Sequence, residues 1–344
     1  MIAALVLFCL LVLSVFTQVG GLLSRFAPSK MVMQRTGGPR LEEIVLQSGK
    51  SDNKIAVVPL EGVIMGESID GSGFNLVQII QEQLKRAAED DEVKAVLLKV
   101  DSPGGEVLAS DEIYKAIQKF QKNSKKPVVA SMGTVAASGG YYVSAPCQWI
   151  VANEMTITGS IGVIMSSINY RALMDKVGVR PEVFKSGKFK DMLRGSKADN
   201  EIQPEERKMI QDLIDETFQQ FKSIVGEGRS FAEQANKGSA DKAQSLAPDW
   251  ASYADGRIFS GKEALKLGFV DELGNFDTAV ARAKKLAGIQ DASVVQYQQT
   301  FDLSNLLRFF GKTDFKSGVK VDLGLDMPKL KAGRLYFVAP TFVH

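Results

Sequence analysis

Serine and lysine, not histidine, are the residues that could carry acid–base chemistry in this chain. The chain has 344 residues and a single histidine, His344, which is its last residue. Termini are the least ordered part of most domains, so neither a serine–histidine or cysteine–histidine pair nor a histidine zinc site is expected within the fold. A nucleophilic serine would then need another base. Lysine is the leading candidate, because burial can make it a neutral amine near pH 7.

Ser138 has the local sequence of an accessible nucleophile. It lies in a run of small residues, 133–140, which follows the apolar segment 128–132. A serine at the tip of a strand-to-helix turn can present its hydroxyl to a carbonyl group, while the next N–H points at the developing oxyanion. A tight turn in which Ser138 only caps a helix explains the same residues equally well.

A second glycine turn lies at the end of another predicted strand. Residues 101–105, DSPGG, follow the apolar segment 95–100. Adjacent glycines let the backbone approach a reacting carbonyl closely. Ligands of open α/β sheets bind outside the carboxyl ends of the strands, so this turn and Ser138 are predicted on the same functional edge. Taken alone, the second turn could equally be an ordinary loop.

The elements that would position both turns follow an alternating pattern. Short apolar runs alternate with amphipathic stretches at 55–60, 76–88, 95–100, 108–120 and 127–132. This pattern predicts an α/β fold with a mainly parallel sheet and helices on its faces. After Pro204, apolar residues at helical spacing predict a helix whose stripe is core or subunit interface. The stripe consists of Met209, Ile210, Leu213, Ile214, Phe218, Phe221 and Val225.

Four segments are predicted along the chain. They are a transmembrane anchor at 1–24, a juxtamembrane linker at 25–53, a folded domain at 54–288 and a C-terminal extension at 289–344. The uncharged apolar run 2–19 is long enough as a helix to cross about 30 Å of hydrocarbon and contact lipid. It lacks a basic n-region and a clear cleavage site, so a retained anchor is preferred to a cleaved signal peptide.

Charge and cysteine content limit the possible partners. With 42 basic and 40 acidic residues and a net charge of +2, no basic surface for nucleic acid is expected. The two cysteines, Cys9 and Cys147, lie far apart and indicate neither a disulfide framework nor a metal site. The positive-inside rule predicts a cytoplasmic domain from the basic residues after the span. These are Arg25, Lys30, Arg35 and Arg40.

Several motifs follow the apolar span in the sequence. They are SPGG at 102–105, ASGGYY at 137–142, TGSIGV at 158–163 and SGKFKD at 186–191. In this order they resemble the signal peptide peptidase A family. Two further motifs resemble the closing segment of the family, DGR at 255–257 and ALKLGFVD at 264–271. The resemblance extends from about Lys54 to Gly288 and is weaker in the tail after Ile289.

The resemblance implies a serine peptidase with a serine–lysine dyad on a Clp-protease-like, crotonase-type fold. Ser138 is then the nucleophile and Lys190 its general base, with Lys185 and Lys188 as second choices. Asp191 is expected to face away from Ser138, because a carboxylate beside the base would keep the lysine protonated.

The resemblance also implies supporting residues. Ser160 would orient the lysine, and the N–H groups of Gly105 and Gly139 would stabilise the oxyanion. Neither a cofactor nor a metal is implied.

The implied substrates are hydrophobic peptides retained in the membrane, especially remnant signal peptides. Such a peptide could add as a strand to a sheet edge, and residues 61–65, EGVIM, are a candidate edge with a core strand as the alternative. The family forms a ring or dome in which neighbouring protomers or different domains supply the serine and lysine, so a homo-oligomeric ring is expected. The family also places its catalytic domain outside the cytoplasm, opposite to the positive-inside expectation.

Two other function classes share part of the pattern. A crotonase-type acyl-CoA enzyme has a glycine-rich oxyanion turn but uses carboxylates for proton transfer and needs no nucleophilic serine. A noncatalytic membrane scaffold would keep the fold without turnover, although the intact Ser138 and Lys190 argue against it.

Overall fold

The computed structural model describes residues 38–67, 74–239, 241–299 and 334–339. The predicted membrane span at 2–19 and His344 lie outside these ranges. No helix within them is long and apolar enough to cross a membrane. The chain divides into units Met1–Gly38 and Pro39–His344, and the fold described below belongs to the second unit.

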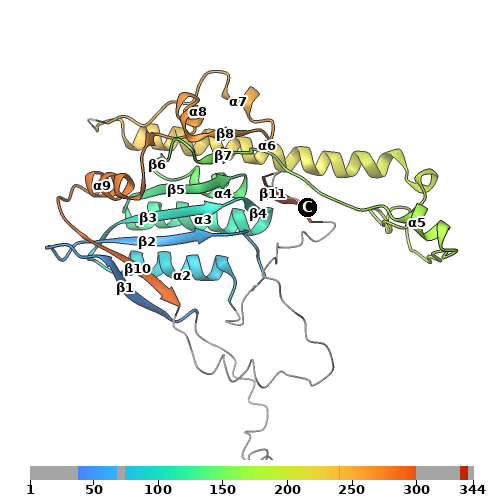
Figure 1. Cartoon of the computed structure of the whole chain (residues 1–344), viewed down its shortest axis with the longest axis horizontal. Helices are drawn as coiled ribbons and strands as arrows, with labels where there is room; N and C mark the ends of the chain where they lie inside the picture. Colours follow the sequence, from blue (N-terminus) through green and yellow to red (C-terminus); the bar gives the residue numbers. More distant parts are fainter. Residues whose placement is uncertain (1–37, 68–73, 240, 300–333, 340–344) are drawn as a thin grey trace, which may run out of the picture. The chain divides into compact units, whose positions relative to one another are not determined.

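Strands account for the centre of this unit. They are β1 (Leu41–Gln47), β2 (Lys54–Glu61), β3 (Val93–Ser102), β4 (Gly104–Glu106), β5 (Val128–Ala137), β6 (Trp149–Ala152), β7 (Ile157–Gly159), β8 (Ile258–Ser260), β9 (Glu272–Leu273), β10 (Ser293–Gln299) and β11 (Tyr336–Val338). The main sheet has the order β1-β10-β2-β3-β5-β6-β9, with β7 also paired to β5 and β8 to β7 (Figure 1). Its pairs are parallel except β1 with β10 and β7 with β8, which confirms the mainly parallel α/β prediction. A separate antiparallel pair joins β4 and β11.

Helices follow most of the strands. They are α2 (Leu76–Glu89), α3 (Val107–Ser124), α4 (Gly139–Ser144), α5 (Arg171–Lys176), the 3-10 turn η1 (Asp199–Glu201), α6 (Pro204–Ala235), α7 (Trp250–Tyr253), α8 (Gly261–Lys266) and α9 (Phe276–Leu286). Proline is accepted at the first position of α6, because its missing N–H would have no partner inside the helix. In α2, the side chain of Asn75 caps the first turn.

The central parallel strands are buried on both faces, which explains their continuous apolar sequences. In β2, Ala56 and Val58 belong to the larger core cluster with α2, α3 and α4. Ile55 and Val57 point to the opposite face, where the cluster includes α9. The larger of these side chains, those of valine and isoleucine, each contribute about 1.5 to 3 kcal/mol when fully buried. The rigid sheet fixes the loops that follow β3 and β5.

The sheet extends beyond the boundaries predicted for the folded domain. β1 lies within the predicted linker 25–53, and β10 lies within the predicted extension 289–344. These two strands pair with each other, with Val45 opposite Val295. Only Leu41 of β1 is buried, so its sequence has little strand periodicity. Its pairing partner is distant in sequence and gives no local signal.

Candidate active site

Ser138 lies in a strained turn between β5 and α4. Its φ of 54° and ψ of −116° fall where non-glycine residues are rare. The turn is held from both sides, since the N–H of Ser138 donates to the Gly159 carbonyl at 2.8 Å and its own carbonyl accepts from the N–H of Tyr142 at 2.8 Å. Strain of this kind persists only where the surrounding structure imposes it.

The Ser138 side chain does not cap the helix. It makes no capping bond to α4, and its Oγ has no hydrogen-bond partner within the described ranges. The residue is only 1% exposed. Buried hydroxyls normally have a partner, so this orphaned group, at the carboxyl end of a parallel strand, fits a nucleophile and not a structural cap.

Gly105 and Gly139 bring their backbones together next to this turn. A Cβ atom added to Gly139 would lie 3.1 Å from the Gly105 nitrogen and 2.7 Å from the Ser110 Oγ. A Cβ added to Gly105 would lie 1.9 Å from the Ile64 carbonyl oxygen. Only glycine fits this close approach. The geometry thus places the two predicted oxyanion donors beside each other and next to Ser138.

Ser160 lies across the sheet ladder from the nucleophile turn. Ala137 is paired with Gly159 in the register of β5 and β7, so Ser138 and Ser160 follow paired residues. Ser160 also has a positive φ, 50°, and its N–H donates to the Arg257 carbonyl at 2.7 Å. It is 3% exposed. The described chain therefore brings together Ser138, Ser160 and the two glycines.

Lys190 is the predicted site residue that the single chain does not bring to Ser138. It belongs to residues 165–203, here called the lysine arm, most of which is exposed. Figure 1 shows α5 and the first turns of α6 extending past the ends of the sheet strands. Because Ser138 Oγ has no partner among the described residues, no lysine of this chain is hydrogen-bonded to it there.

The lysines around Lys190 are paired with carboxylates. Lys185 lies 2.7 Å from Asp191, and Lys188 lies 3.7 Å from Glu205. Lys190 itself has no hydrogen-bond or ion-pair partner in the part of the chain that the structure describes. The Asp191 carboxylate accepts from Lys185, so it is engaged within the arm. Among these three lysines, Lys190 is therefore the one without a carboxylate partner in the described residues.

Lys197 is a buried lysine that the sequence did not single out. Its Nζ lies 2.6 Å from Glu206 and 3.4 Å from Asp191, and its side chain is 4% exposed. Burial alone would lower the pKa of Lys197, but hydrogen bonds and charge from the two carboxylates raise it above its ordinary value. Lys197 therefore stays protonated and ties the arm to α6. Nothing in the local sequence distinguishes it from a solvated lysine.

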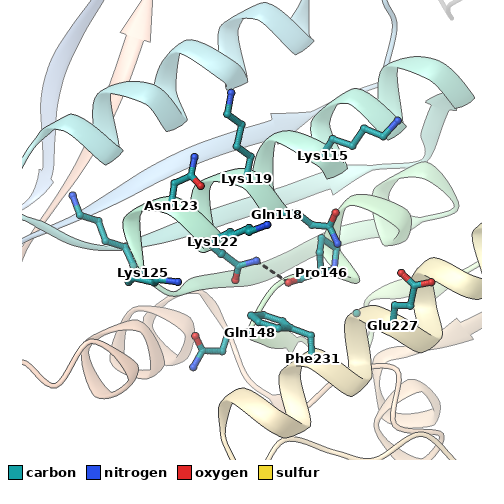
Figure 2. Close-up of a pocket in the computed structure, with 13 residues that line it drawn as sticks. Lys115, Gln118, Lys119, Lys122, Asn123, Lys125, Pro146, Gln148, Glu227 and Phe231 are labelled. Atoms are coloured by element: carbon teal, nitrogen blue, oxygen red, sulfur yellow. Dashed lines mark hydrogen bonds between the residues drawn. The ribbon is translucent and has the colours of Figure 1, made fainter.

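Two large cavities lie on the surface, and neither is lined by a predicted site residue, although the second is lined by Glu106, which follows Gly105 in the chain. The first cavity has a volume of about 920 Å³. Figure 2 shows lysines from α3 on one side of it and Glu227 and Phe231 of α6 on the other. None of the predicted site residues lines it. The second cavity, about 990 Å³, runs along β4 and α3. It is lined by residues that include Glu106, Val107, Tyr142, Arg334, Leu335 and Phe337.

Two protein-family models match segments of the chain that contain predicted site residues. The sequence model of Peptidase family S49 matches residues 120–290, which include Ser138, Ser160 and Lys190. That of Clp protease matches residues 61–148, which include Gly105.

Three relatives show the extent of the similarity. A putative signal peptide peptidase SppA of Enterococcus faecium is 37% identical over 266 residues, covering 76% of this chain and 72% of the relative. A putative protease of Synechocystis, slr0021, is 41% identical over 223 residues, covering 65% and 73%. A chloroplastic serine protease SPPA of Arabidopsis thaliana is 32% identical over 260 residues, covering 76% and 34%.

Proposed function

The chain belongs to peptidase family S49 and is a serine-type peptidase. From this premise we propose that it cleaves hydrophobic peptides held at the membrane, such as remnant signal peptides. In this proposal Ser138 and Lys190 form the catalytic dyad. The observation that carries the proposal is the state of Ser138. Its backbone is strained, and its buried hydroxyl has no hydrogen-bond partner among the described residues. The same match favours a peptidase over a crotonase-type acyl-CoA enzyme.

The reaction uses groups at the carboxyl ends of β3 and β5. Neutral Lys190 takes the proton of Ser138 as the Oγ attacks the peptide carbonyl carbon, and the N–H groups of Gly105 and Gly139 stabilise the oxyanion. The resulting ammonium then protonates the amine that leaves. Water repeats the cycle on the ester of Ser138 and releases the acid. Ser160 orients the lysine.

A second copy of the chain supplies the lysine. A lysine accepts a proton only as the neutral amine, and burial away from carboxylates favours that form. Lys190 is exposed in the single chain, so another copy must cover it. The lysine arm carries exposed apolar side chains, among them Ile168 at 79%, Leu173 at 63% and Phe184 at 89%. Apolar groups gathered on one segment are typical of an interaction surface, and a head-to-tail contact closes into a ring.

The membrane gives the peptidase access to its substrates. Residues 2–19 anchor the chain in the bilayer, and the catalytic domain faces the extracytoplasmic side despite the basic residues after the span. Protease added to intact cells tests this orientation, because an extracytoplasmic domain is cleaved and a cytoplasmic one is protected.

Covalent labelling tests the nucleophile. A fluorophosphonate probe should label the wild-type protein at Ser138, and Ser138→Ala should lose both the label and peptide cleavage. Ser124→Ala is the matched control, since Ser124 lies at the end of α3, and it should keep both. Labelling of Ser138→Ala at the wild-type level would contradict the proposal.

A further inference from the structure

The motif DGR at 255–257 lies beside the site, yet it has no part in the proposed reaction. It forms a turn between α7 and β8, here called the DGR turn. β8 pairs antiparallel with β7, with Ile258 opposite Gly159. β7 also pairs with β5, the strand that ends just before Ser138. The DGR turn is therefore connected to the nucleophile turn through the end of β7.

The backbone of the DGR turn holds Ser160. The Arg257 carbonyl accepts from the Ser160 N–H at 2.7 Å. Ser160 has a φ of 50°, which a residue with a side chain keeps only where its surroundings impose it. The preceding residue, Gly159, accepts from the Ser138 N–H at 2.8 Å. The pair of residues 159–160 is thus bonded to the nucleophile turn on one side and to the DGR turn on the other.

Two glycines let the DGR turn and β8 approach this segment closely. A Cβ added to Gly159 would lie 2.4 Å from the Phe259 ring, and a Cβ added to Gly162 would lie 3.1 Å from the Gly256 Cα. The Phe259 ring is 7% exposed and stacks on Phe269 with centroids 5.5 Å apart. Because β8 is anchored in the core, the DGR turn is a firm support for the end of β7.

The side chains of Asp255 and Arg257 lock the DGR turn. The Arg257 Nε and Nη2 lie 2.7 and 2.5 Å from the two carboxylate oxygens of Asp255. One of these oxygens also accepts from the Arg257 backbone N–H at 3.2 Å. Hydrogen bonds from Arg257 lower the pKa of Asp255 below its ordinary value, so the pair is ionised at neutral pH. Gly256 between them has a φ of 90°, which glycine adopts without strain.

This clamp, the ion pair of Asp255 and Arg257, adds little to the stability of the fold. The two side chains are 48% and 51% exposed, and the Arg257 guanidinium lies over the Tyr253 ring, 5.4 Å from its centroid. Exposed ion pairs contribute roughly 0 to 1 kcal/mol. A planar guanidinium fork on a carboxylate nevertheless fixes geometry. Its effect is therefore expected on the direction of the Arg257 carbonyl and not on the melting temperature.

We propose that Asp255 and Arg257 are positioning residues, whose clamp aims the Arg257 carbonyl at the Ser160 N–H and so holds the Ser160 hydroxyl where it orients the catalytic lysine. They act through Ser160 and take no proton themselves. Each residue of the motif has a use in this role: the carboxylate closes the turn, glycine allows its φ, and the guanidinium completes the clamp. The inference rests on the proposed serine–lysine mechanism.

A split between kcat and KM tests the role. Asp255→Ala should lower kcat by about tenfold to a hundredfold and change KM by less than about twofold, because a misplacement on the order of 1 Å can cost about a hundredfold in rate. Asp255→Asn keeps an acceptor for the Arg257 N–H, so it should regain most of the loss. A rise in KM at unchanged kcat would assign the turn to substrate binding and overturn the proposal.

Asp212→Ala is the matched control. Asp212 pairs with Lys208 at 2.7 Å, and the side chains are 59% and 73% exposed. This variant loses an ion pair that is at least as exposed as the clamp but lies on α6 and makes no contact with Ser160. It should keep both kcat and KM within about twofold of the wild type.

A double-mutant cycle shows whether Asp255 acts through Ser160. Ser160→Ala alone should lower kcat, and adding Asp255→Ala should lower it further by less than about twofold, because residues in one chain of contacts are not additive. If the two losses multiply, Asp255 acts by another route and the positioning role is wrong.

Hydrogen exchange tests the clamp without catalysis. The Ser160 amide is protected in the full-length protein by its bond to the Arg257 carbonyl. Asp255→Ala and Gly256→Ala should each speed its exchange at least about tenfold, whereas Asp212→Ala should not. Gly256→Ala acts through its φ alone, since nothing lies within 4 Å of an added Cβ. An unchanged Ser160 amide in both variants, each folded by its melting temperature, would overturn the clamp.

The assays separate the possible failures. Faster exchange at Ser160 in Asp255→Ala, without cleavage of any peptide by the wild-type enzyme, would contradict the proposed function and keep the clamp on Ser160. Cleavage that is lost in Lys190→Ala but normal in Asp255→Ala and Gly256→Ala would leave the dyad standing and overturn the positioning role.

Discussion

The nucleophile turn and the lysine arm are built in opposite ways. The nucleophile turn, residues 137–140, joins the central strand β5 to α4, and Ser138 is 1% exposed. In the arm, Phe184 is 89% exposed, and many contacts are local, such as the 2.9 Å pair of Arg171 with Asp175. One region is positioned by the whole sheet, whereas the other is positioned mainly by its own residues.

Helix α6 connects these two kinds of structure. Its C-terminal half is fixed in the core, where Arg229 lies 2.5 Å from Asp271 and is 1% exposed. Its N-terminal half carries the arm through Lys197 and Glu206. The comparison teaches that the chain preorganises Ser138 and the two glycines, whereas Lys190 lies on a projecting segment. Under the proposed mechanism, a complete site therefore requires a neighbouring copy of the chain.

Mixing two inactive variants gives the largest effect. Ser138→Ala and Lys190→Ala should each lower turnover by about a thousandfold or more, because the two side chains act as one unit. If neighbouring copies supply the two side chains, an equal mixture of the two variants should regain activity after its subunits dissociate and reassemble. About a quarter of the sites then hold both an intact Ser138 and an intact Lys190, so up to about a quarter of the wild-type rate is expected. The measurement is the rate of peptide cleavage before and after subunit exchange.

Lys188→Ala is the matched control for this experiment. Lys188 is exposed and pairs with Glu205 at 3.7 Å, so its loss should change turnover by less than about threefold, as for other exposed ion pairs. A mixture that stays inactive after verified subunit exchange would show that the serine and the lysine come from the same chain. The proposal that the lysine arm completes the site of a neighbouring copy would then be wrong.

Two glycine substitutions sharpen the comparison at a smaller scale. Gly104 has a φ of 101°, and an added Cβ would lie 1.9 Å from the Phe337 oxygen and 2.7 Å from the Gly139 nitrogen. Gly104→Ala should displace an oxyanion donor and lower kcat by about a hundredfold to a thousandfold. Gly178 in the arm has a φ of 73° with nothing within 4 Å. Gly178→Ala should cost only the backbone strain of about 1 to 2 kcal/mol.

Activity and melting temperature separate the two outcomes. Gly104→Ala should lose activity far beyond its loss of stability, whereas Gly178→Ala should keep kcat within about threefold. If the two variants lose the same activity for the same decrease in melting temperature, then steric crowding at the oxyanion site does not explain the lost activity of Gly104→Ala.

Sequence reasoning reached the parts of the site that depend on local backbone. The turn at Ser138, the glycines 105 and 139 and the strands before them follow from apolar runs that end in small residues. Ser160, by contrast, was found through a motif resemblance and not through a physical signal. Its place next to Ser138 depends on the pairing of β7 with β5, which joins separate segments.

The parts that could not be predicted depend on contacts between distant residues. β1 and β10 close one side of the sheet, yet their pairing joins opposite ends of the described chain. The helical stripe after Pro204 was predicted as core or interface, and it divides: Phe221 and Val225 are buried, while Met209 and Leu213 are each 42% exposed. Periodicity identifies the stripe but not what covers each part of it.

The smallest expected effect concerns the charge that orders the arm. Lys185, followed by Lys197, lowers the pKa of Asp191 below its ordinary 3.8. A lowered pKa means that the ionised carboxylate stabilises the arm above about pH 3.8, and that this stabilisation is lost as pH falls through the folded pKa.

Asp191→Asn should therefore reduce amide protection of residues 185–197 at pH 7, after correction for intrinsic exchange. The difference from wild type should shrink as pH falls through the folded pKa of Asp191, because the protonated carboxyl and the amide are both neutral. Asp175→Asn, which removes the Arg171 pair in α5, should leave these amides unchanged at pH 7 and in acid. A difference that persists in acid would mean that shape, and not charge, makes Asp191 necessary for holding the arm beside Lys190.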